Sequence, residues 1–116
     1  MFGYSHVAQV SGELVLIAGQ YDSDAAGHTT SRDFAVQVSN AFINLGIALR
    51  SVGLDYADVA QLRTFIVDHN LDKLTIPGKK IAEIWGERPP VQTSNGVAPL
   101  ALPGTLFEVD VVAVRG

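Results

Sequence analysis

Residues 88–114, RPPVQTSNGVAPLALPGTLFEVDVVAV, contain the pattern that decides the fold class. Pro89 and Pro90 open this stretch, as prolines do at the start of a strand, and a Pro103-Gly104 turn divides it. After the turn, apolar side chains recur at every second position, which is the period of a strand with one buried face. The stretch therefore predicts two strands joined through a turn.

The second of these strands has two different faces. Alternation gives one face four apolar side chains: Phe107, Val109, Val111 and Ala113. It gives the opposite face two carboxylates among apolar neighbours: Leu106, Glu108, Asp110, Val112 and Val114. Two carboxylates on one face of a mostly apolar strand indicate either a sheet face open to water or a functional site.

Three further strands are predicted before this region. Residues 14–18 (LVLIA) are apolar at every position, which is typical of a central strand that is buried on both faces. Residues 6–10 predict a short strand before it, and residues 59–67 (VAQLRTFIV) predict a strand in the middle of the chain.

A long helix is predicted between residues 34 and 52, because apolar side chains recur there at helical spacing. Thr30 or Ser31 is expected to supply its N-cap, and Gly53 stands where a left-handed residue ends a helix. Gly46 inside the helix indicates close packing, because an interior glycine lowers helix stability by roughly 1 kcal/mol relative to alanine.

A second helix is predicted over residues 75–85, with Thr75 as its cap and Pro77 in its first turn. The expected order is β-β-α-β-α-β-β. This order predicts an α+β sandwich, a single domain over residues 1–116, with two helices on one face of a mixed sheet.

The composition excludes several function classes. The net charge is −4 and the eight basic residues are scattered, so a nucleic-acid partner is disfavoured. No cysteine is present, and His6, His28 and His69 lack metal-ligand spacing, so no metal site is expected. Neither a signal-peptide pattern nor a membrane-spanning apolar run is evident, which favours the cytoplasm. The hydrophobic fraction of 47% is high for 116 residues and favours a subunit interface.

Short motifs along the whole chain carry a family resemblance. They are residues 4–10 (YSHVAQV), residues 16–20 (LIAGQ), Gln37, Asn44, Leu45 and Leu49 of the long helix, Asp58-Val59, residues 65–68 (FIVD), the proline-led strand and residues 107–113 (FEVDVVA). In this order they resemble the RidA/YjgF family, which implies a fold like that of chorismate mutase and a homotrimer with clefts between subunits. The catalytic branch of the family further implies deamination of enamines and imines such as 2-aminoacrylate by water, without metal or organic cofactor.

Three positions depart from the pattern of that catalytic branch. Gln92 stands where the branch has an arginine for the substrate carboxylate, Ala18 replaces a serine, and Gly78 replaces an asparagine. Tyr4 is retained, and so is Glu108, which matches the acid that holds a water in the family. The chain thus resembles the branches that lack the arginine.

The resemblance and the alternation together give a set of candidate site residues. Glu108 is the candidate catalytic group, with a solvated carboxylate as the alternative; the candidate substrate contacts are Tyr4, Gln92, Ala18 and Arg88. Arg88 or Arg63 is a candidate replacement for the missing anion anchor. The alternatives are a solvated loop residue for Arg88 and a structural ion pair for Arg63.

Two functions remain open at this point. One is a cofactor-independent hydrolase or deaminase of enamine or imine metabolites; the other is a non-catalytic ligand-binding or regulatory trimer. An amide at Gln92 cannot supply the charge-assisted fork of a guanidinium, so slow hydrolysis of imino acids is expected. An RNA-directed activity fits poorly with the acidic charge.

Overall fold

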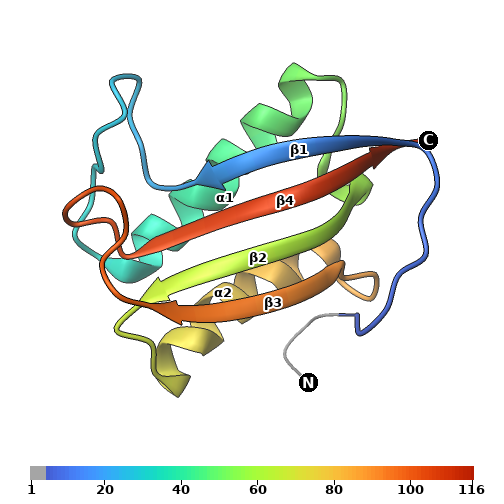
Figure 1. The fold of residues 1–116 in the computed structure, drawn as a ribbon. Helices are drawn as coiled ribbons and strands as arrows, with labels where there is room; N and C mark the ends of the chain where they lie inside the picture. The colour runs from blue at the N-terminus through green and yellow to red at the C-terminus, as the bar shows by residue number, and fades with distance from the viewer. Residues whose placement is uncertain (1–4) are drawn as a thin grey trace.

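The computed structural model describes residues 5–116 and has the α+β class that the sequence predicts. Two helices pack on one face of a four-stranded sheet (Figure 1). In chain order the elements are β1 (Glu13–Gln20), α1 (Phe34–Ser51), the 3-10 turn η1 (Tyr56–Asp58), β2 (Val59–Val67), α2 (Leu71–Trp85), β3 (Val91–Val97) and β4 (Phe107–Arg115). Within the described residues, no helix is long and apolar enough to cross a membrane.

The strand that comes last in the chain, β4, lies inside the sheet. The strand order is β1-β4-β2-β3. β4 is antiparallel to both of its neighbours, whereas β2 and β3 are parallel, so the sheet is mixed as expected. The predicted Pro103-Gly104 turn is present between β3 and β4, where the Thr105 amide donates to the Leu102 carbonyl oxygen at 3.2 Å. β2 nevertheless separates these two strands in the sheet.

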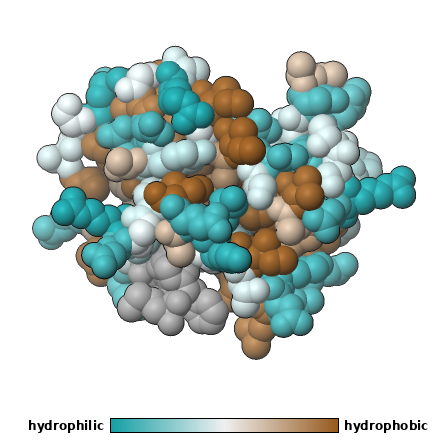
Figure 2. All heavy atoms as spheres, turned by 180° about the vertical axis from the view of Figure 1, so that it is seen from behind, coloured by the Kyte–Doolittle hydropathy of each residue, from teal (hydrophilic) through white to brown (hydrophobic). Residues whose placement is uncertain are grey.

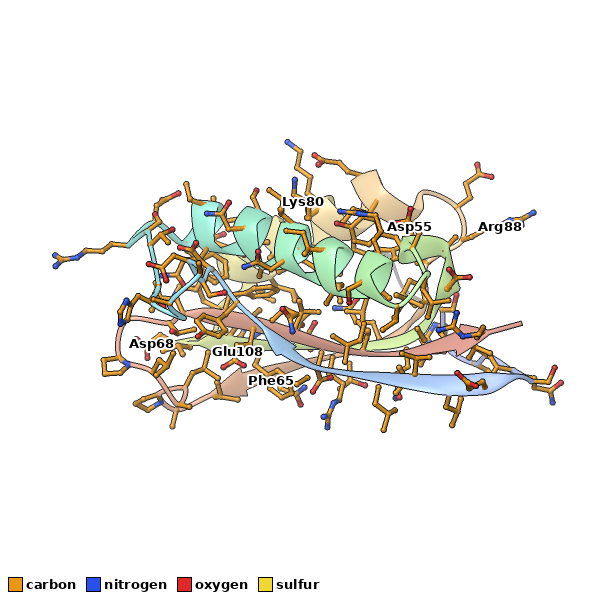
Figure 3. The ribbon with its side chains drawn as sticks, turned by 90° about the horizontal axis from the view of Figure 1, so that it is seen from above. Asp55, Phe65, Asp68, Lys80, Arg88 and Glu108 are labelled. Carbon is orange, nitrogen blue, oxygen red and sulfur yellow. The ribbon has the colours of Figure 1, made fainter. Side chains whose placement is uncertain are left out.

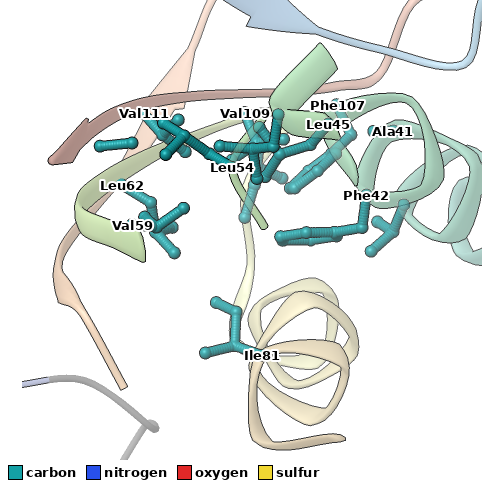
Figure 4. Packing of buried hydrophobic residues seen from close by; sticks show 14 residues of the cluster. Ala41, Phe42, Leu45, Leu54, Val59, Leu62, Ile81, Phe107, Val109 and Val111 are labelled. Atoms are coloured by element: carbon teal, nitrogen blue, oxygen red, sulfur yellow. The ribbon is translucent and has the colours of Figure 1, made fainter. Parts of the chain in front are cut away.

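The helix-facing side of β4 is the centre of the core. Its four apolar side chains are between 0% and 3% exposed, which confirms the period of two: Phe107, Val109, Val111 and Ala113. Figure 4 shows Phe42 and Leu45 of α1 packed against this row, with Ile81 of α2 beside them. Phe42 also contacts the Phe107 ring, with 5.9 Å between the ring centroids.

β1 is an edge strand, so its expected central position is wrong. Val15 and Ile17 pack against the core, but Leu14 and Leu16 are 60% and 75% exposed on the other face. A run of apolar residues does indicate a strand whose two faces are both to be buried. The described part of this chain supplies that cover on the helix side.

The expected strand at residues 6–10 is also absent. Ser5 forms a single bridge to Val91, with its amide donating to the Pro90 carbonyl oxygen at 3.0 Å and its hydroxyl to Pro89 at 2.6 Å. Beyond it, residues 6–10 run without a ladder. Prolines have no N–H group, so Pro89 and Pro90 offer a neighbouring segment acceptors but no donors.

Both helices begin at residues other than those expected. Asp33 caps α1 and accepts from the Val36 amide at 3.0 Å. The Thr30 hydroxyl instead donates to Asp22, and the Ser31 hydroxyl accepts from the Asp33 amide. Gly53 follows the end of α1 with φ of 78°, as predicted.

α2 starts four residues before Thr75. Asn70 is its cap and accepts from the Lys73 amide at 2.8 Å, so Pro77 lies inside the helix and not in its first turn. Seen from the helix side, hydrophilic side chains cover much of the surface (Figure 2). Three exposed apolar side chains belong to α1 on that side: Val36, Ile43 and Ile47.

Gly46 is packed as closely as its position inside α1 predicts. A Cβ atom at this position would collide with the hydroxyl group of Tyr56, which donates to the Phe42 carbonyl oxygen at 2.6 Å. Gly78 of α2 differs, because nothing lies within 4 Å of a Cβ atom placed there. Close packing against Tyr56 therefore requires a glycine at position 46, whereas no neighbouring atom requires one at position 78.

Gly46→Ala and Gly78→Ala should change stability in opposite directions. We expect Gly78→Ala to raise the free energy of unfolding by about 0.5–1 kcal/mol through helix propensity alone. Gly46→Ala should lower it by about 1–3 kcal/mol, because Tyr56 has to move away from its buried acceptor. Urea denaturation followed by circular dichroism measures both values. Equal stabilisation by the two substitutions would contradict the close packing at Gly46.

Candidate functional site

Glu108 lies on the sheet face that the helices leave uncovered. Its neighbours along β4 point into the core, so Glu108 points to the opposite side, where it is half-buried. The Cα partner of Glu108 on β2 is Phe65, and the partner of Asp110 is Arg63. Cross-strand partners share a face, so these four side chains form one group, the Glu108 cluster. Figure 3 shows Phe65 and Glu108 in the same part of the sheet.

β1 places a glycine against the Glu108 carboxylate. The register between β1 and β4 shifts between Ile17 and Gln20, so Ala18 and Gly19 form an irregular segment beside β4. A Cβ atom at Gly19 would collide with Oε1 of Glu108. Glycine at this position therefore leaves the space that the carboxylate occupies. The candidate residue Ala18 precedes it in the same irregular segment, and its predicted contact with a substrate stays a prediction.

Two effects raise the pKa of Glu108 above the usual value of a glutamate. The larger effect is partial burial, which removes water from the charged form, and the smaller one is the negative charge of Asp110. A carboxyl group with a raised pKa binds a proton more strongly than an ordinary glutamate. This property suits a group that takes a proton from water and later returns it.

Arg63 and Asp110 form a bidentate ion pair beside Glu108. Nε and Nη2 of Arg63 donate to the two carboxylate oxygens of Asp110 at 2.9 Å and 2.6 Å. The guanidinium also lies 5.5 Å from the centroid of the Phe65 ring. Hydrogen bonding to Asp110 raises the pKa of Arg63 further. The structure thus gives Arg63 the ion pair that was one of its two interpretations.

Gln92 does not belong to the Glu108 cluster. Its parallel Cα partner is the buried Leu62, so Gln92 points to the helix side of the sheet. There its Nε2 atom donates to the Ser94 hydroxyl at 2.8 Å, and its buried Oε1 atom has no partner. The β3 residues on the same face as Glu108 are a different set: Val91, Thr93 and Asn95. None of them is basic.

Arg88 and Tyr4 are also not brought to Glu108 by the described structure. Arg88 lies on the loop before β3, at the other end of the sheet from Glu108 (Figure 3). It borders an open groove there together with Asp58 and Pro89. Tyr4 lies outside the described residues, so its predicted contact with a ligand stays a prediction.

A buried glutamine of α1 connects the loop before α1 with the loop before β4. Gln37 of α1 is 0% exposed, and its Nε2 atom donates to the carbonyl oxygens of Ser31 at 2.8 Å and Gly104 at 2.9 Å. Its Oε1 atom accepts from the Leu106 amide at 2.8 Å. The bonds to Gly104 and Leu106 hold the loop that leads into β4, two residues before Glu108, and the bond to Ser31 ties it to the loop before α1.

The loop that leaves β1 is held in a similar way by Asp22. This carboxylate is 1% exposed and accepts from the Thr30 hydroxyl at 2.6 Å, the Ser31 amide at 2.8 Å and the Asn40 amide group at 2.9 Å. Burial acts to raise the pKa of Asp22, but these hydrogen bonds outweigh it and lower the pKa. Asp22 follows Gly19 closely, so its network also positions the β1 side of the cluster.

Two members of this site were missed in the sequence. Phe65 shares the parity of Arg63 on β2, which is visible in the sequence, but its place opposite Glu108 depends on strand register. Gly19 stood in a recognised motif, yet its role as the neighbour of the carboxylate depends on the β1 bulge. Within residues 5–116, no group of three or more metal-ligating side chains is arranged to hold a metal ion.

The family model described as "Endoribonuclease L-PSP", which covers the RidA/YjgF proteins, matches residues 1–115. The chain belongs to the RidA/YjgF family. No curated protein sequence matches the chain. This membership confirms the resemblance seen in the motifs.

Solved structures of RidA/YjgF proteins are similar over most of the chain. The Rid family protein YyfB of Yersinia pestis is 37% identical, with a TM-score of 0.91 over 98% of this chain and 88% of that one. YyfB is described as a protein of unknown function. Rv2704 of Mycobacterium tuberculosis, a member of the YjgF/YER057c/UK114 family, is 27% identical, with a TM-score of 0.75 over 91% of this chain and 82% of that one.

Glu108→Gln should stabilise the protein at neutral pH and lose this advantage in acid. The pKa of Glu108 is raised in the folded state. Its contribution to stability is therefore complete below the unfolded pKa, about 4.3 for glutamate, and is lost as the pH rises through the folded value. We expect a higher melting temperature than wild type at pH 7 and equal values near pH 3.5 by scanning calorimetry.

Glu13→Gln is the matched control for this substitution. Glu13 is an exposed residue of β1 that pairs with Arg115 at 3.3 Å, away from the cluster. The control should not raise the melting temperature at pH 7. A lower melting temperature for Glu108→Gln than for wild type at pH 7 would show that the fold favours the charged carboxylate, against this prediction.

Proposed function

We propose that this RidA/YjgF protein is a cofactor-independent hydrolase that deaminates a small enamine or imine metabolite, with Glu108 as the proton-transferring group. The observation that supports this most directly is the Glu108 carboxylate itself. It is half-buried, has a raised pKa and lies against Gly19 on the uncovered sheet face. Carboxyl groups with such shifted pKa values are more frequent at functional sites than elsewhere on a protein surface, and Gly19 leaves room for this one.

The chemistry of this proposal needs little more than one carboxyl group and a water. Water adds to the carbon of the protonated imine while Glu108 accepts a proton from it, which gives a neutral carbinolamine. Glu108 then returns this proton to the nitrogen and accepts the hydroxyl proton as the C–N bond breaks, so that ammonia leaves and a carbonyl compound forms. The proton left on Glu108 passes to ammonia, which gives ammonium and restores the carboxylate. An enamine reaches the same path after its tautomerisation to the imine. No electrons are exchanged with an acceptor, so the reaction needs no redox cofactor.

Assembly into a homotrimer with clefts between subunits is part of the same proposal. The uncovered face carries Leu14 and Leu16, which are more than half exposed in a single chain. Together with Val112, these side chains line an open apolar groove that His6, Val7, Ala8 and Val10 border. Burial of such a surface by further copies of the chain would be favourable by roughly 25 cal/mol per Å² of apolar area. It would also enclose the neighbouring Glu108 cluster.

A second candidate function is ligand binding without catalysis. The feature that favours it is the pairing of Arg63 with Asp110, which leaves the cluster without an available anion anchor of the kind the catalytic branch is expected to use. Ala18 also lacks the hydroxyl of the serine it replaces. RNA cleavage, which the description of the family model names, gains no support from an acidic cluster on a chain of net charge −4.

Multi-angle light scattering should give about three times the monomer mass. We expect Leu16→Glu to reduce this mass, because it places a charge on the uncovered apolar face. Ile47→Glu is the matched control on the solvent side of α1, where the wild-type side chain is also more than half exposed. It should leave the mass unchanged. A monomeric wild-type protein at micromolar concentration would contradict the shared clefts.

Ammonia release tests the catalytic proposal. An oxidase generates imines in situ, and ammonia formation above the uncatalysed rate is measured with wild type and with Glu108→Gln. We expect Glu108→Gln to lower the rate by about 10²–10⁴-fold, the usual contribution of a general acid–base group. The substitution is nearly isosteric, so the mass and the circular dichroism spectrum should not change. An unchanged rate would assign Glu108 no catalytic role.

A further inference from the structure

We infer that the Glu108 cluster prefers substrates that carry a positive charge on the reacting nitrogen and no carboxylate. Its substrates are then imines formed from simple amines, and not imino acids. This inference rests on the proposed function, because it names the substrate class of the same site. It follows from the signs of the charges that the sheet places around Glu108.

Within one chain, the cluster has an excess of negative charge. Glu108 and Asp110 contribute two carboxylates, and Arg63 contributes one guanidinium, which is bound to both oxygens of Asp110. The Asp110 side chain is only 19% exposed, so little water is available to replace the guanidinium. The β2–β4 register holds the two residues directly opposite each other. Arg63 therefore compensates Asp110 and leaves the charge of Glu108 for a ligand.

The other basic side chains of residues 5–116 lie elsewhere. Lys73 is on the helix side, where Nζ donates to the Val67 carbonyl oxygen at 3.0 Å and lies 5.7 Å from the Phe34 ring centroid. Arg115 pairs with Glu13 and donates to Val52. The remaining five are on α1, α2 and the loops: Arg32, Arg50, Lys79, Lys80 and Arg88.

The three histidines of the same chain also lie outside the cluster. His28 is in the loop after β1, beside Asp24. His69 lies against Gly96, which is on the helix side of β3 because its partner is the buried Ile66. His6 borders the groove over Gln61, four residues before Phe65 on β2, which is about 13 Å at the usual rise of a strand.

This arrangement suits a protonated imine. The iminium form of an imine carries one positive charge, which the Glu108 carboxylate attracts, whereas the carboxylate of an imino acid would lie beside a like charge. The Phe65 ring offers apolar surface for the rest of a small substrate. The reaction R–CH=NH₂⁺ + H₂O → R–CHO + NH₄⁺ balances in atoms and charge. Its substrate is supplied by the two-electron oxidation of a primary amine.

A pair of substrates that differ only in the carboxylate tests this preference. Butylamine with a flavin-dependent amine oxidase gives butan-1-imine, and norvaline with an amino-acid oxidase gives the same imine with a carboxylate on its carbon. We expect the wild-type protein to accelerate ammonia release at least tenfold more with the butylamine product. Equal acceleration, or faster hydrolysis of the norvaline product, would overturn the inference.

Asp110→Asn should reverse the preference, because it releases Arg63 beside Glu108. We expect the ratio of the two rates to shift by about tenfold or more toward the norvaline product. Glu13→Gln is the matched control, because it removes the same charge and releases Arg115 from its ion pair outside the cluster. Its ratio should equal that of wild type. A shift of the same size with Glu13→Gln would overturn the assignment to Arg63.

Binding separates this inference from the proposed function. Butylammonium and pentanoate are titrated into wild-type protein while the amide resonances of Gly19 and Glu108 are followed by NMR. Selective shifts with butylammonium would support the charge preference even if neither imine is hydrolysed, an outcome that would remove only the hydrolase proposal. Stronger shifts with pentanoate, or none with either compound, would overturn the inference.

Discussion

The helices of this chain cover one face of a four-stranded sheet, and the other face has to be stabilised by something else. That constraint shapes every residue on the uncovered side. Leu14 and Leu16 present apolar surface there, while Glu108, Asp110 and Arg63 present charges on the neighbouring strands. Apolar and charged regions share one sheet face, so contacts that cover the first also set the polarity around the second. A subunit interface over the apolar region, as proposed above, would therefore also change the polarity around the charged one.

The sequence predicted the fold best where one local pattern had one structural meaning. The alternation in residues 107–113 identified the buried face of β4, and residues 59–67 were predicted with the bounds that β2 has. Helix starts were less certain, because Asn70 and Thr75 are both good caps. The edge position of β1 was not predictable from the sequence. A run of apolar residues indicates that both faces of a strand are to be buried, but not whether the same chain or another copy buries them.

The site predictions depended on register, which a single sequence does not show. Glu108 could be placed on a face because β4 alternates clearly. Gln92 could not, because the strand after Pro89 and Pro90 takes its facing from parallel pairing with β2, and this pairing turns Gln92 toward the helices. The contact between Arg63 and Asp110 joins residues 47 positions apart, so no local pattern predicts it.

The position of β4 in the sheet also affects how the protein is made. Glu13 of β1 pairs with Arg115 of β4, 102 residues later, and β4 is the only strand that β1 contacts in the described sheet. At roughly 5–20 residues per second, translation therefore produces β1 roughly 5–20 s before its partner. During this interval the nascent chain exposes an apolar strand with free edges, a typical target for chaperones. The sheet can therefore be completed only after β4 has been synthesised.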